Sequence, residues 1–159
     1  MTHISEAMRG ALGAVLDRRV SYPVAESDIR RWAIAVYYPD APPARFLDPA
    51  ADIVAPEEFN AFAWCVAKQE TTGTGDVVHL EKSLGIPPPR VNFALNGGME
   101  VEYGEPIRPG DVLTAVKRLT RYDERSGRLG RMLFTTLEDT WTNQRAERVR
   151  RHRTTLIRY

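Results

Sequence analysis

The chain has 159 residues, of which 43% are hydrophobic and 27% charged, a composition that is ordinary for a globular protein. The length fits a single domain over residues 1–159, and one cysteine excludes an internal disulfide and a multi-cysteine metal site. No signal peptide and no apolar run of membrane-spanning length are apparent, so we expect a cytoplasmic protein.

Charge is distributed unevenly along the chain. Residues 1–80 contain 7 Lys/Arg and 11 Asp/Glu, whereas residues 81–159 contain 15 and 10, with many arginines between positions 145 and 158. A solvated sheet face or an edge strand protected by charge accounts for this cluster. An anion surface for a nucleotide phosphate or an acidic carrier protein is the alternative. Nucleic acid is not expected as a partner, because no recognition motif is present and the basic excess is modest.

The first third of the chain predicts two helices. Apolar residues at helical spacing indicate a short amphipathic helix over residues 4–16, followed by an extended piece over residues 18–24. Ser27 is a suitable N-cap for a second helix, which Pro39 ends. A proline-rich loop then leads to residue 50.

The segment Pro56–Lys68 predicts the central helix of the fold. Pro56 suits the first helical position, and Glu57 and Glu58 favour the positive end of the helix dipole. Its apolar stripe consists of Phe59, Phe62, Ala63, Val66 and Ala67. Trp64 and Cys65 lie off this stripe, so we expect a helix that is buried on most sides.

The second half of the chain is rich in predicted strands. Residues 71–90 form an irregular segment with a short strand at 77–80, and its TGTG run lacks the context of a phosphate-binding loop. Period-two patterns then predict strands at 99–103, 111–122, 131–141 and 148–159. Three turns join them, including one at 123–127, which predicts an antiparallel meander. The expected class is α+β, with the sheet wrapped around the central helix.

Three stretches resemble a known family when they are taken in order: VSYPVAESDIRRWAIAV, IVAPEEF and LNGGMEVEYGEPIRPGDVLTA. They are similar to the N-terminal-type domain of MaoC-like dehydratases, also called the FAS1-like dehydratase domain, a branch of the hot-dog fold. The resemblance implies hydration of enoyl thioesters or dehydration of 3-hydroxyacyl thioesters of coenzyme A or acyl carrier protein, in fatty acid, polyketide or steroid metabolism. It also implies that no metal or redox cofactor is needed and that two hot-dog units pair edge to edge.

The resemblance further implies a catalytic Asp-x-x-x-x-His dyad in the loop before the central helix. In PDAPPARF, Asp40 occupies the aspartate position, but the residue five places on is Arg45. Arginine stays protonated, so it cannot act as the base. Asp40 is the one catalytic candidate, and capping a turn is its structural alternative. We expect Arg45 to contact solvent or phosphate.

Substrate contacts are expected from two places. In the resembling family, backbone N–H groups at the start of the central helix stabilise the thioester oxygen, which here implicates the helix start formed by Pro56 and Glu57 as substrate-binding, although proline itself has no N–H to donate. Asn96, Gly97 and Gly98 either line the acyl tunnel or form a bend or bulge that requires glycine.

The histidines and the cysteine give weaker signals. His3 lies near the terminus and His152 in an arginine-rich strand, where we expect a solvated side chain. His79 is placed to fold over a pocket mouth. No histidine pair has metal-ligand spacing, so no metal is expected. Cys65 is expected in the core.

Several functions remain open at this point. The first is an acyl-accommodating subunit of a hydratase or dehydratase whose hot-dog partner supplies the dyad. The second is a self-sufficient homodimer that uses Asp40 with His79 or a helix-start glutamate. The third is a non-catalytic module that binds an acyl group or small molecule, and a thioesterase is a weaker option. In each case we expect a homodimer or heterodimer, because a single sheet leaves an exposed edge.

Overall fold

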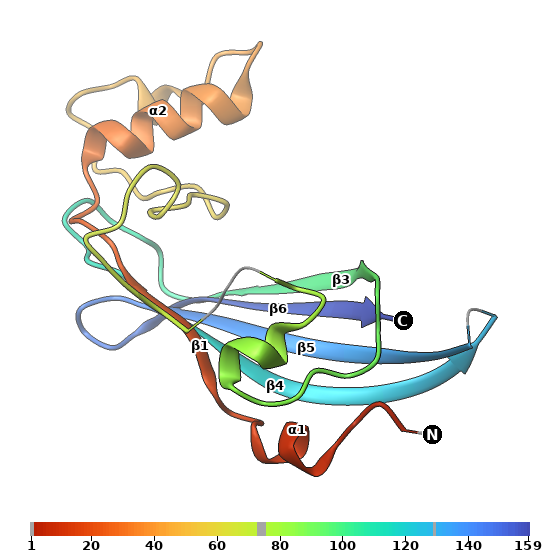
Figure 1. Ribbon diagram of the computed structural model, residues 1–159. Helices are drawn as coiled ribbons and strands as arrows, with labels where there is room; N and C mark the ends of the chain where they lie inside the picture. Colours follow the sequence, from red (N-terminus) through yellow and green to blue (C-terminus); the bar gives the residue numbers. More distant parts are fainter. Residues whose placement is uncertain (1, 73–75, 129) are drawn as a thin grey trace.

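The computed structural model describes residues 2–72, 76–128 and 130–159 of the chain. Its six strands form one antiparallel sheet in the order β2-β1-β4-β5-β6-β3, which confirms the α+β class (Figure 1). The strands are β1 Val15–Val20, β2 Lys68–Thr71, β3 Ala94–Tyr103, β4 Thr114–Gly127, β5 Gly130–Thr142 and β6 Arg148–Arg158. The helices are α1 Glu6–Gly10, α2 Glu26–Tyr37 and the short 3₁₀ turns η1 Ala44–Phe46 and η2 Leu80–Leu84.

The predicted helices at the N-terminus are partly right. Helix α2 is confirmed, although its N-cap is Ala25 rather than Ser27. The first helix is shorter than expected, because Ser5 caps it at one end and the chain enters β1 at Val15. Figure 1 shows α2 standing apart from the long strands, at one end of the molecule.

The helix predicted over residues 56–68 is wrong. Two tight turns replace it: the Phe59 amide bonds to the Pro56 carbonyl, and the Ala63 amide bonds to the Asn60 carbonyl. The Asn60 side chain also accepts a hydrogen bond from the Phe62 amide, which competes with helical bonding. Phe59 and Phe62 are buried as predicted, but two aromatic residues three positions apart need only a turn to reach the core.

The predicted antiparallel meander is confirmed for β4, β5 and β6, but it is wrong for β3, the first of the four predicted strands. Strands β4, β5 and β6 follow one another through hairpins, and the turn predicted between the last two strands is present at residues 143–147. The turn predicted at 123–127 is wrong, because β4 runs on to Gly127, which pairs with Gly130. Strand β3 pairs with β6 at the far side of the sheet, since Gly104 and Glu105 bond to the carbonyls of Val149 and Arg148.

The segment before β3 also differs from expectation. Residues 77–80 do not form a strand; the chain instead turns through η2, which lies across the sheet (Figure 1). Residues 73–75 of the TGTG run lie outside the described residues.

One face of the sheet carries the core, and we call it the inner face. The first apolar cluster joins α2 and residues 46–62 to Ala115, Trp141 and Val149 of the sheet. The second cluster packs Leu80 of η2 on Leu119. The opposite, outer face carries ion-paired and polar side chains, such as Arg153 bonded to Glu138.

Candidate functional site

A small cavity lies where the segment after Ile53 meets the start of β6. Its volume is about 210 Å³. It is lined by Val54, Ala55, Pro56, Glu57, Tyr103, Gly104, Glu105, Pro106, Ile107, Val149 and Arg150. The predicted substrate residues Pro56 and Glu57 therefore lie together in one cavity, and Arg150 and Tyr103 join them.

Arg150 is the cationic residue in the lining of this cavity and is only 4% exposed. Its Nη2 donates to the carbonyls of Glu57 and Phe59, the latter at 3.0 Å. The guanidinium carbon lies 4.7 Å from the Trp141 ring centroid. Among the described residues, no carboxylate lies within ion-pair distance of Arg150, and its buried Nε has no hydrogen-bond partner.

The electrostatic environment of Arg150 is unusual for an arginine. Burial lowers its pKa, against the opposing influence of Tyr103, Glu58 and Glu57. Arginine remains a cation even so, because its ordinary pKa is far above neutrality. A buried cation without a paired carboxylate is costly, so the cavity is suited to an oxygen that carries partial or full negative charge.

The sequence did not reveal Arg150. The arginines between positions 145 and 158 were expected to be solvated, and this is wrong for two of them. Side chains alternate along β6, so Arg150 and Arg158 are buried on the inner face, whereas Arg151 and Arg153 pair with glutamates on the outer face. The alternation itself was visible in the sequence, but both faces carry arginine, so it did not tell which face is buried.

Asp40 and Arg45 lie away from this cavity. Both side chains are exposed in the loop that follows α2. The Asp40 amide bonds to the Tyr37 carbonyl, and the Arg45 guanidinium lies over the Phe46 ring at 4.8 Å. A catalytic role for Asp40 stays a prediction.

Asn96, Gly97 and Gly98 form a β-bulge in β3. The register shifts between Asn96 and Gly98, and the Asn96 side chain accepts a hydrogen bond from the Gly98 amide. Gly98 has a φ of +122°, and a Cβ at Gly97 would lie 2.8 Å from Ile157 Cγ1. The two glycines also line a hollow of about 800 Å³ with outer-face residues such as Arg153. Contact of these residues with an acyl group stays a prediction.

His79 is held by its neighbours. Its Nδ1 lies 3.2 Å from the Asp76 carboxylate and its Nε2 lies 3.0 Å from the Val91 carbonyl. These contacts fix the start of η2 against the chain before β3. These contacts give His79 a tethering role, and a position over a pocket mouth stays a prediction.

His152 lies on the inner face, half-buried, instead of being solvated. It is the cross-strand partner of Asp139, and its ring centroid lies 5.5 Å from that of Trp141. Burial and the charge of Arg150 lower the pKa of His152, while Asp139 opposes them. Asp139 accepts a hydrogen bond from Arg19 at 2.8 Å, and its other oxygen is buried without a partner among the described residues.

Cys65 is exposed, so its predicted core position is wrong, and the neighbouring Trp64 is 62% exposed. This follows from the missing helix, because the turn after Asn60 carries both side chains outward. Within residues 2–72, 76–128 and 130–159, no three His, Cys, Asp or Glu side chains gather into a metal-binding group. Over the same ranges, no helix has the length and apolar character needed to cross a membrane.

The architecture is shared with solved structures. The ChsH1–ChsH2 complex from Mycobacterium tuberculosis contains a chain 20% identical to this one, with a TM-score of 0.56 over 89% of this chain and 82% of that chain. The HadBC (3R-hydroxyacyl-ACP dehydratase) complex from the same organism gives 18% identity and a TM-score of 0.55 over 92% of this chain and 96% of that chain. The MaoC-like dehydratase from Rhodospirillum rubrum gives 18% identity and a TM-score of 0.54 over 94% of this chain and 92% of that chain.

These likenesses show the fold, which is the predicted hot-dog fold. The family model described as "FAS1-like, dehydratase domain region" matches residues 11–152. The chain therefore belongs to this MaoC-like dehydratase family, an enzyme family, as its sequence motifs predicted. A search of curated protein sequences found no relative of the chain.

Proposed function

We propose that this chain is the acyl-accommodating subunit of an (R)-specific enoyl-thioester hydratase or 3-hydroxyacyl-thioester dehydratase. A second hot-dog chain supplies the Asp/His dyad. The observation that supports this function is that Arg45 stands five residues after Asp40, where the resemblance implies the dyad histidine, in a member of a dehydratase family. Arginine cannot accept the proton of the attacking water, whereas histidine is suited to proton transfer near neutral pH.

The free edge of the sheet supports a hot-dog partner. Strand β3 pairs with β6 along one side, and its side chains are mostly exposed. Three large apolar side chains on it are exposed: Leu95, Met99 and Tyr103. An exposed edge of ten residues is a template for a further strand, and a second hot-dog sheet would cover it. The ChsH1–ChsH2 and HadBC structures are complexes of two kinds of chain, which is consistent with a heterodimer here.

The chemistry uses the substrate and water, without a cofactor. The partner's dyad orients a water molecule toward Cβ of the enoyl group and passes its proton to Cα. This chain contributes the wall that holds the acyl thioester of coenzyme A or acyl carrier protein. A cytoplasmic site of action stays part of this expectation.

Hydration by defined assemblies tests this role. The purified chain is assayed alone and with a co-expressed hot-dog protein that carries an intact Asp-x-x-x-x-His and is encoded beside it. Crotonyl-CoA and a longer enoyl-CoA serve as substrates. We expect barely detectable turnover by the chain alone, because a missing general base removes a factor of about 10²–10⁴. Turnover should appear with the partner and vanish when the partner's dyad histidine becomes alanine.

A self-sufficient homodimer is the second candidate, and one observation favours it. His152 and Asp139 are cross-strand partners on the inner face, and one Asp139 oxygen has no partner among the described residues. A half-buried imidazole beside a carboxylate can act as the base that takes a proton from water. Robust turnover by the chain alone that His152→Gln abolishes would establish this candidate and overturn the subunit role.

A further inference from the structure

The protein contacts of the buried Arg150 do not balance its positive charge. Arginine has five N–H donors, and Nη2 uses its two on the carbonyls of Glu57 and Phe59. The buried Nε has no hydrogen-bond partner among the described residues, and the same holds for the buried Nε atoms of Arg19 and Arg151. Arg19 and Arg151 are paired with carboxylates, whereas no carboxylate among the described residues forms an ion pair with Arg150. Buried charges are normally paired, so the missing counter-charge indicates an oxygen-bearing ligand in the adjacent cavity.

The cavity next to Arg150 limits the kind of ligand. Its walls are largely apolar, with Val54, Ile107 and Val149 among them, and its volume of about 210 Å³ suits a small group. Glu57 and Glu105 also line it, and both are exposed. Both carboxylates are screened by solvent, so they would oppose a phosphate dianion more strongly than the single charge of an enolate that faces the buried guanidinium.

Arg150 also lies where the sequence predicted the binding site of the thioester oxygen. The sequence predicted that backbone N–H groups at the start of a helix at Pro56 would bind the thioester oxygen. That helix is absent, and the chain there presents carbonyls, two of which bind Arg150. Beside Pro56, the positively charged group is therefore the Arg150 guanidinium and not the N-terminus of a helix.

We propose, on the basis of the hydratase role proposed above, that Arg150 binds the carbonyl oxygen of the acyl thioester and stabilises the enolate that forms on it. In hydration, the water oxygen bonds to Cβ and the C=C electron pair moves toward the carbonyl, placing negative charge on the thioester oxygen. The proton lost by water passes to the partner's histidine and then to Cα, which restores the carbonyl. Arg150 is the donor that faces this charge.

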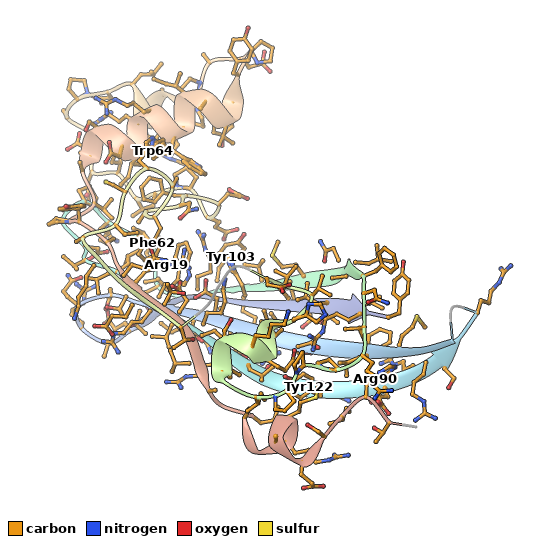
Figure 2. All side chains as sticks on the ribbon, viewed as in Figure 1. Arg19, Phe62, Trp64, Arg90, Tyr103 and Tyr122 are labelled. Carbon is orange, nitrogen blue, oxygen red and sulfur yellow. The ribbon has the colours of Figure 1, made fainter. Side chains whose placement is uncertain are left out.

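Tyr103 contributes to the same wall. The Arg150 guanidinium lies 5.4 Å from its ring centroid, so the ring and that of Trp141 hold the cation in place. Figure 2 shows Tyr103 in the same region as Phe62 and Arg19, at the end of the sheet nearest helix α2.

Binding is tested first, with a substrate that lacks phosphates. Crotonyl-pantetheine is titrated into the ¹⁵N-labelled assembly, and the arginine Nε–H resonances are followed by NMR, with the Arg150 signal identified by its loss in Arg150→Lys. We expect this resonance to shift with crotonyl-pantetheine and to stay unchanged with inorganic phosphate. An unchanged resonance with the thioester, or an equal response to phosphate, overturns the assignment.

Kinetics then test the role in the transition state. Arg150→Lys keeps the positive charge but loses the planar guanidinium with its several N–H donors. We expect kcat for crotonyl-CoA to fall about 10²-fold with little change in KM. Arg151→Lys is the matched control, because the neighbouring Arg151 pairs with Glu102 on the outer face, and its kcat should stay unchanged. Equal kcat values for Arg150→Lys and wild type overturn the assignment.

The two proposals fail in different ways. If the partnered assembly hydrates crotonyl-CoA while Arg150→Lys leaves kcat unchanged, the Arg150 role fails and the hydratase role stands. If crotonyl-pantetheine shifts the Arg150 resonance while no assembly hydrates crotonyl-CoA, the thioester site stands and the hydratase role fails. Because the resonance is measured in the folded wild type, poor folding of a variant cannot hide the first result.

Discussion

The guanidinium of Arg158 and the carboxylate of Glu81 form a two-pronged ion pair in which both side chains are 0% exposed. Nη2 lies 2.6 Å from Oε1, and Nη1 lies 2.8 Å from Oε2. The Tyr122 hydroxyl donates to the same carboxylate at 2.7 Å, and the Thr135 hydroxyl accepts from Arg158. This network ties η2 to the inner face of the sheet, beside the second apolar cluster.

Removing one partner of this pair should be strongly destabilising. Glu81→Gln leaves the Arg158 cation buried without a counter-charge, and we expect the free energy of unfolding to fall by about 3–5 kcal/mol in urea titrations. The double variant Glu81→Leu/Arg158→Met should recover most of the loss, because no buried charge remains. Glu70→Gln, which breaks the exposed pair with Lys68, is the control and should change stability little. Equal effects of Glu81→Gln and Glu70→Gln would contradict the buried network.

The same pair predicts how stability depends on pH. Burial alone would raise the pKa of Glu81, but hydrogen bonds and charge from Arg158, aided by the Tyr122 hydroxyl, outweigh it and lower this pKa. Its stabilisation is then complete above the unfolded-state pKa of about 4.3 and is lost as pH falls through the lower folded-state pKa. Urea midpoints should therefore drop as pH falls below about 4, and the drop should be smaller in Glu81→Gln. A steeper acid loss in that variant would contradict the sign.

Gly104 should tolerate no side chain. A Cβ there would lie 2.1 Å from the Arg148 carbonyl oxygen, and backbone cannot move aside cheaply. Gly104→Ala should therefore lower the thermal midpoint by several degrees and disturb the Arg150 cavity that Gly104 lines. Gly10→Ala, with nothing within 4 Å, is the matched control and should be neutral or slightly stabilising. A neutral Gly104→Ala would show that β3 and β6 are farther apart here.

The sheet was largely predictable because its signal is local. Alternating apolar and polar residues mark each long strand, and the turn at Asn143 uses a side chain suited to bond its own backbone. The order in which the strands pair was harder to predict from the sequence. Nothing in the local pattern of β3 tells that it joins β6 rather than β4, since that choice depends on the contacts of Gly104 and Glu105 with the start of β6.

The candidate site was predictable only in part. Pro56 and Glu57 line a cavity, while their contact with substrate stays a prediction, and the helical period of Phe59 and Phe62 was a poor guide to the backbone around them. Two apolar residues three positions apart satisfy a helix and a turn equally well, and Asn60 decides for the turn. Arg150 was hidden because burial of an arginine needs carbonyl and aromatic neighbours from three separate parts of the chain.

Phe62 should remain a stability determinant although the predicted helix is absent. Its ring packs edge-on against Trp141, with centroids 4.9 Å apart, and under the Arg19 guanidinium at 4.9 Å. Phe62→Ala should lower the free energy of unfolding by about 3–5 kcal/mol, because it removes a buried aromatic ring and leaves a cavity. Tyr38→Ala, at an exposed ring, is the control for urea titration and should be nearly neutral. A loss below about 1 kcal/mol at Phe62 would mean that this part of the core is not packed in solution.

The edge of β3 should determine assembly. Leu95 and Met99 are 49% and 61% exposed there, beside backbone groups that have no neighbouring strand on this side among the described residues. Lysine on an edge strand opposes pairing with another sheet, so Leu95→Lys/Met99→Lys should release this chain as an 18.0 kDa species in sedimentation experiments. Ile34→Lys/Val36→Lys is the matched control: these α2 side chains are also exposed, and the double variant should sediment as wild type. If the β3 variant stays associated while the α2 variant dissociates, the partner binds helix α2, and edge-to-edge pairing is wrong. The β3 variant should also lose partner-dependent hydration of crotonyl-CoA, whereas Asp40→Ala should leave it nearly unchanged, because the partner supplies the dyad.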